Sequence, residues 1–172
     1  MSKVLDEYFG AVRSSDVAAY GYGVVEDFLG RPYALDAFDW VITNPPFRLA
    51  EEFVLRALPI ARRGVAMLTR TVFLESSGRY ERLFRDTPPT VVAQFVERVP
   101  MVKGRLDQRA STATGYCWLV WRKPLASSAT VFWIPPCRKA FERVGDYEKA
   151  PQPMPFKPID RIGAGKADLF GN

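Results

Sequence analysis

The 172-residue chain contains no histidine. This excludes Ser-His-Asp and Cys-His nucleophile systems, His-ligated zinc or iron, and imidazole as a proton shuttle near neutral pH. The only two cysteines, Cys117 and Cys137, form no C-x-x-C pair, so the sequence predicts neither a metal knuckle nor a disulfide framework. Any reaction must therefore run without imidazole, and we expect no metal ion.

Long apolar runs are also lacking. No run approaches the ~18 residues that span a bilayer, and acids interrupt the first residues where a signal peptide needs an apolar stretch. We therefore expect a cytoplasmic protein without membrane contact. Apolar residues make up 48% of the chain, enough for a packed core, and the length predicts about one domain. The 24 basic and 19 acidic residues give a net charge of +5, which favours a polyanionic partner such as nucleic acid.

The middle of the chain has the pattern of a strand, a helix and a second strand. Pro45 and Pro46 stop the first strand at Asn44. Apolar residues then recur at helical spacing, and Gly64 is expected to end that helix. The next apolar run is continuous, as in strands buried on both faces of a parallel sheet. The three expected elements are a strand over 38–42, a helix over 49–61 and a strand over 65–69. Together they predict a βαβ unit.

Weaker patterns flank this unit. We expect a helix over 4–12, a strand over 13–17, helical residues over 77–85, and strands over 91–96, 116–122 and 130–134. The segment 100–115 reads as a long basic loop. Proline and basic residues accumulate near the end. We therefore divide the chain into a folded domain, residues 1–137, and a C-terminal tail, residues 138–172.

The motif Asn44-Pro45-Pro46-Phe47 is the sharpest chemical signal. Open α/β sheets bind ligands outside the carboxyl ends of their strands, and this motif follows such an end. The Asn44 side-chain carbonyl and the Pro45 carbonyl are two acceptors that suit a planar NH2 group, and the Phe47 ring can stack on the ring bearing it. The motif therefore predicts a site for an exocyclic amine that attacks an electrophilic methyl group. No general base is needed at the start, which agrees with the lack of histidine.

This motif resembles that of the S-adenosylmethionine-dependent amino-methyltransferases. It is most similar to the adenine-N6 DNA branch, whose motif is Asn or Asp, Pro, Pro, then Tyr or Phe. The resemblance covers roughly residues 4–134 and implies an α/β, Rossmann-like methyltransferase sheet. That sheet would lack its first strand and close with an antiparallel hairpin of residues 91–96 and 116–122. The implied function is methylation of adenine N6 in DNA.

The resemblance also implies how S-adenosylmethionine binds. In the family, an acid at the end of the second strand accepts hydrogen bonds from the cofactor ribose, and Asp16, followed by Val17, matches it. A second acid, in an Asp-Phe pair, contacts the cofactor adenine, and Asp27-Phe28 matches that pair. The family's Gly-rich loop, which cradles the methionine, has no match in these 172 residues. We therefore expect the chain alone to bind the cofactor weakly, unless a partner subunit supplies the missing elements.

Other readings of the motif stay open. The same Asn-Pro-Pro pattern resembles guanine-N2 RNA methyltransferases and glutamine-N5 protein methyltransferases, which share the amine chemistry. The chain could also be a catalytically incomplete remnant of this fold that binds nucleic acid or a partner subunit. The basic net charge favours DNA, with RNA as the next candidate, over a protein substrate.

The basic loop predicts salt-dependent DNA binding through Lys103, Arg105 and Arg109. Binding that neutralises phosphates releases counterions, so log K falls with log salt in proportion to the contacts made. Replacing all three residues with alanine should weaken binding and flatten the salt dependence in a filter-binding titration. An unchanged slope would mean that another surface contacts the phosphates.

Overall fold

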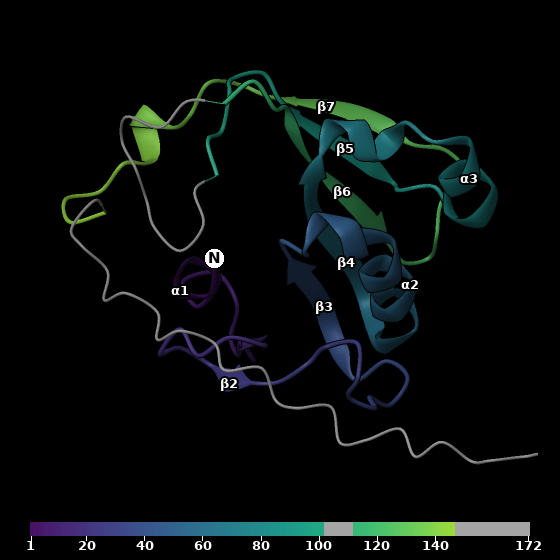
Figure 1. Ribbon diagram of the computed structural model, residues 1–172, viewed down its shortest axis with the longest axis horizontal. Helices are drawn as coiled ribbons and strands as arrows, with labels where there is room; N and C mark the ends of the chain where they lie inside the picture. Colours follow the sequence, from purple (N-terminus) through teal and green to yellow (C-terminus); the bar gives the residue numbers. More distant parts are fainter. Residues whose placement is uncertain (102–111, 147–172) are drawn as a thin grey trace, which may run out of the picture.

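A five-stranded mixed sheet forms the centre of the protein (Figure 1). The computed structural model describes residues 1–101 and 112–146. The strand order is β3-β4-β6-β5-β7. The strands are β3 (Phe38–Thr43), β4 (Ala61–Arg70), β5 (Val91–Phe95), β6 (Tyr116–Arg122) and β7 (Thr130–Ile134). With helix α2 (Ala50–Ile60) packed against it, this sheet makes the fold mixed α/β.

The expected βαβ unit is present. β3 and β4 pair in parallel and α2 connects them. One face of α2 is fully buried, at Ala50, Val54, Ala57 and Ile60. β4 is buried on both faces from Gly64 to Thr69, as its continuous apolar run predicts.

The expected role of Gly64 is wrong. α2 ends at Ile60, directly after Pro59, and β4 begins at the next residue, so Gly64 lies inside the strand. A Cβ atom at Gly64 would lie 2.5 Å from the Trp40 ring and 2.6 Å from the carbonyl oxygen of Trp121. The residue is glycine because β3 and β6 both approach it closely, a tertiary constraint that local sequence does not reveal.

One expected strand pairing, the antiparallel hairpin of residues 91–96 with residues 116–122, is present between β5 and β6. β5 and β6 are antiparallel, and β6 is also antiparallel to β4. β7 pairs in parallel with β5 and forms the edge of the sheet opposite β3. The largest fully buried side chain, Trp121 of β6, donates from Nε1 to the Thr87 carbonyl at 3.0 Å. This hydrogen bond satisfies its only polar atom.

The N-terminal segment lies beside β3, at the edge of the sheet. It comprises helix α1 (Ser2–Leu5) and a parallel pair of two-residue strands, β1 (Ser15–Asp16) and β2 (Val24–Val25) (Figure 1). The helix is shorter than the expected 4–12. Val4 is 51% exposed and Tyr8 is 73% exposed, so its apolar residues gain little burial to stabilise further turns.

Short helices complete the described structure. They are η1 (Phe47–Leu49), η2 (Thr71–Leu74), α3 (Ser77–Arg79), the π-helical turn η3 (Tyr80–Phe84) and η4 (Lys139–Phe141). Just after η4, Arg143 forms an ion pair with Glu7 at 2.6 Å, which ties the start of the expected tail to the N-terminal segment. Residues 147–172 of that tail lie outside the described residues. None of the helices in the described ranges is long and apolar enough to cross a membrane.

The packing around Gly64 predicts that one methyl group added at this position strongly lowers the stability of the protein. Gly64→Ala should destabilise the protein by about 1–3 kcal/mol, because the added carbon overpacks the junction of β3, β4 and β6. Urea unfolding monitored by circular dichroism measures this loss. Gly10→Ala is the matched control, since a Cβ atom there meets nothing within 4 Å. Equal midpoints for the two variants would contradict the packing argument.

Candidate active site at the carboxyl edge of the sheet

Four strands, β3, β4, β5 and β7, end at the same edge of the sheet. β3 and β4 are parallel, and β5 shares their direction because both β4 and β5 are antiparallel to β6. Asn44 follows β3, Arg70 ends β4, and Tyr116 begins β6 at this edge. The edge therefore corresponds to the place where open α/β sheets bind ligands.

The Asn-Pro-Pro-Phe turn leaves the Asn44 side chain exposed, whereas Pro45 and Phe47 pack against the protein. Asn44 is exposed, Pro45 is buried and Phe47 is half-buried at the start of η1. The Pro46 carbonyl accepts from the Leu49 amide at 2.8 Å, which closes the turn. The Asn44 Nδ2 lies 3.7 Å from the Met101 sulfur, and within the described ranges no donor reaches its side-chain oxygen. That oxygen is therefore available to a ligand.

The Phe47 ring has two close neighbours. The guanidinium carbon of Arg70 lies 4.5 Å from its centroid. The Tyr116 ring packs against it with centroids 5.8 Å apart and planes tilted by 42°. Arg70 and Tyr116 are cross-strand partners in the β4–β6 register, so the same pairing positions both. An aromatic and cationic cluster thus lies beside Asn44.

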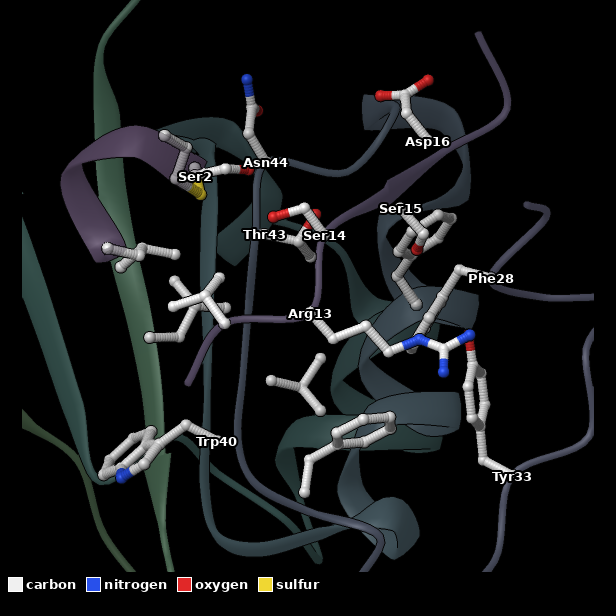
Figure 2. Close-up of a pocket in the computed structure, with 17 residues that line it drawn as sticks. Ser2, Arg13, Ser14, Ser15, Asp16, Phe28, Tyr33, Trp40, Thr43 and Asn44 are labelled. Atoms are coloured by element: carbon white, nitrogen blue, oxygen red, sulfur yellow. The ribbon is translucent and has the colours of Figure 1, made fainter. Parts of the chain in front are cut away.

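A cavity of about 350 Å³ lies between β3 and the N-terminal segment. Figure 2 shows Asn44 and Asp16 at one end of it and Trp40 at the other, with Phe28 and Tyr33 along one side. Ser14, just before β1, and Ser15, its first residue, also contribute to the lining. The volume falls in the range of small-molecule sites, and the lining combines polar, aliphatic and aromatic side chains.

Asp16 and Phe28 lie where a nucleoside could contact them. One Asp16 oxygen, Oδ1, accepts from the Ala18 amide at 2.9 Å, and the second carboxylate oxygen meets no donor within residues 1–101 and 112–146. Phe28 lines the cavity and stacks on Phe53, with centroids 5.0 Å apart. The cavity therefore offers a carboxylate for ribose hydroxyls and an apolar surface for a base.

The structure does not bring every predicted residue into this cavity. Asp27 is not part of the lining, and its Oδ1 accepts from the Leu29 amide at 3.0 Å. Val17 is 53% exposed and also lies outside the lining. Lys103, Arg105 and Arg109 lie outside the described residues. The predicted site residues that meet around the cavity and turn are thus Asp16, Phe28 and the Asn44–Phe47 motif.

Sequence reasoning missed an ionic cluster at the wall of the cavity. Glu26 pairs with Arg13 at 3.0 Å and with Arg31 at 2.7 Å, although its side chain is only 10% exposed. The Tyr33 hydroxyl donates to Glu26 at 2.6 Å. This hydrogen bond and the two arginine charges hold the pKa of Glu26 below its ordinary value of 4.5, against the opposing effect of burial. Arg13 and Tyr33 themselves line the cavity.

No group of three or more metal-ligating side chains occurs in the two described ranges. Comparisons with protein-family models, with curated proteins and with solved structures found no match to this chain. The chemistry of the site is therefore argued from its own residues.

The Glu26 cluster predicts a pH-dependent contribution to stability. Because folding lowers the pKa of Glu26, its carboxylate stabilises the fold above pH 4.5, and this contribution is lost as the pH falls below that value. Glu26→Gln should therefore lower the unfolding midpoint near neutral pH, and its difference from the wild type should narrow at about pH 3. Denaturant unfolding at both pH values measures this. The control is Glu75→Gln, an exposed position without an ion pair in the described ranges. If the unfolding midpoints of Glu26→Gln and the wild type differ as much at about pH 3 as near neutral pH, the stabilising role of the Glu26 carboxylate is contradicted.

Proposed function

We propose that this chain transfers a methyl group from S-adenosylmethionine to an exocyclic amine, with adenine N6 in DNA as the preferred acceptor. One observation carries the proposal: Asn44, whose side-chain oxygen meets no donor among the described residues, lines the same cavity as Asp16 and Phe28. An amine acceptor and a nucleoside-binding surface thus adjoin each other. The antiparallel pairing of β5 with β6 adds support, since the resemblance implies such a hairpin.

The cavity residues fit a nucleoside cofactor. The open Asp16 oxygen can accept from ribose hydroxyls, and Phe28 offers an apolar face for the adenine. The cofactor would supply an electrophilic methyl group. Asp27, the other predicted cofactor residue, would need to change its present hydrogen bond to Leu29 in order to contact a base in this cavity.

The turn supplies what the amine requires. The Asn44 side-chain carbonyl and the Pro45 carbonyl would each accept one N–H of a planar NH2 group. Transfer of the methyl group, with the cofactor sulfur as leaving group, would build up positive charge on this nitrogen. Acceptors aimed at this nitrogen stabilise the charged transition state more than the neutral amine. The extra proton is then lost to water, which reaches the exposed Asn44.

The amine chemistry alone does not choose among substrates. Guanine N2 in RNA and glutamine N5 in protein would present the same NH2 group. Adenine in duplex DNA must flip out of the stack to reach Asn44, at a cost of a few kcal/mol that phosphate contacts must offset. The net charge of +5 and the Arg70 guanidinium beside the turn favour nucleic acid.

Asn44→Ala tests the proposal. It should lower methyl transfer by at least about 100-fold, because it removes an acceptor that acts mainly in the transition state. Binding of S-adenosylmethionine should change much less. The assay is transfer of a tritiated methyl group to DNA, RNA and protein in parallel, at millimolar cofactor because the sequence predicts weak binding. Calorimetric titration of the cofactor accompanies it.

Two conservative variants serve as controls. Asn44→Asp keeps a carbonyl-type acceptor and should retain much more activity than Asn44→Ala. Phe47→Tyr keeps the stacking ring and should be tolerated, whereas Phe47→Ala should weaken substrate capture by about 1–3 kcal/mol. An Asn44→Ala protein that methylates normally would end the proposal. Absence of transfer by the wild type, with intact DNA binding, would favour the remnant alternative.

A further inference from the structure

The Arg70 guanidinium lies over the Phe47 ring, on which the target base stacks in the proposed mechanism. The Arg70 guanidinium lies 4.5 Å from the Phe47 centroid, and Tyr116 flanks the same ring. A flat base needs contact at about 3.5–4 Å on a ring face. A base therefore cannot occupy the face on which Arg70 lies until the guanidinium moves.

The strand register explains why Arg70 is beside the turn. Thr43, the last residue of β3, pairs with Met67, and β4 continues for three more residues. At about 3.3 Å per residue, Arg70 lies roughly 10 Å beyond the end of that pairing. This overhang carries its side chain past the end of β3 to Phe47.

Arg70 has no acidic partner among residues 1–101 and 112–146. Many other arginines do, such as Arg62 with Asp39 and Arg82 with Glu51. Its only described interaction is with the Phe47 ring, and the residue is exposed. A cation–π contact at an exposed site is weak, about 0.5–1 kcal/mol, so the guanidinium can leave the ring at little cost. Its charge is then free to bind an anion.

We propose that Arg70 positions the substrate by binding a backbone phosphate of the target nucleotide, and that its guanidinium leaves Phe47 as the target base stacks there. The planar guanidinium matches phosphate oxygens through two parallel hydrogen bonds. The inference rests on the proposed function and narrows its substrate to a polynucleotide. A glutamine side chain offers neither a base to stack nor a phosphate to bind.

The test asks whether the Arg70 side chain contacts one particular phosphate of the strand. Single-stranded oligodeoxynucleotides with one adenine carry a neutral methylphosphonate at one linkage at a time, and fluorescence anisotropy measures binding at fixed salt. For the wild type, one linkage near the adenine should weaken binding at least about tenfold when neutralised. Arg70→Ala and Arg70→Gln should bind the unmodified strand about as weakly as the wild type binds the strand neutralised at that linkage. In these variants, neutralising the linkage should not weaken binding further.

A matched control lies on the same strand. Arg63 is exposed at the opposite end of β4 and has no ion pair among the described residues. Arg63→Ala removes the same charge and should keep the full effect of the critical linkage. If every linkage has the same effect in Arg70→Ala as in the wild type, or if the wild type binds no oligonucleotide, the inference is overturned.

Binding is measured without cofactor, so the two proposals can fail separately. A linkage effect that depends on Arg70, in a protein that transfers no methyl group, contradicts the proposed reaction and supports the Arg70 contact. If the protein methylates DNA but no linkage effect depends on Arg70, the Arg70 contact is contradicted and the proposed reaction is not.

Discussion

The parallel pairing of β3 with β4 is the constraint on which the candidate site depends. Their register places Thr43 opposite Met67 and lets β4 extend beyond the end of β3. Asn44 thereby leaves the sheet at its carboxyl edge, and Arg70 reaches Phe47. The pairing is possible only because Gly64 leaves room for Trp40 and the Trp121 carbonyl. Packing deep in the sheet thus sets the positions of exposed groups at its edge.

Local signals explain what the sequence could predict. Pro45 and Pro46 end a strand whatever surrounds them, and a continuous apolar run such as that of β4 predicts burial on both faces. The βαβ unit followed from such signals, whereas the β5–β6 pairing was implied by the family resemblance. Gly64 was misread because its reason is an approach by residues from two other strands. The Arg70–Phe47 contact likewise joins segments that are distant in sequence, and the Glu26 cluster joins Arg13, Arg31 and Tyr33 at no regular spacing.

The Asn44–Phe47 turn and the cavity beside it are stabilised by different interactions. The turn is fixed by buried Pro45 and by the hydrogen bond that closes it, so its acceptors need little reorganisation. The side proposed to bind the cofactor includes the two-residue strands β1 and β2, and the Glu26 cluster supplies ionic support at its wall. This difference fits the proposed function, in which the chemistry depends on positioning rather than on a titrating base.

The identity of the methylated atom tests the central claim most directly. DNA incubated with the protein and S-adenosylmethionine is digested to nucleosides and analysed by mass spectrometry against standards for each methylated base. We expect N6-methyladenine and no methylated carbon, since the two acceptors proposed at Asn44 and Pro45 suit an NH2 group and offer nothing that activates a ring carbon. A methyl group on a ring carbon such as cytosine C5, or no methylated product in DNA, RNA or protein, would contradict it.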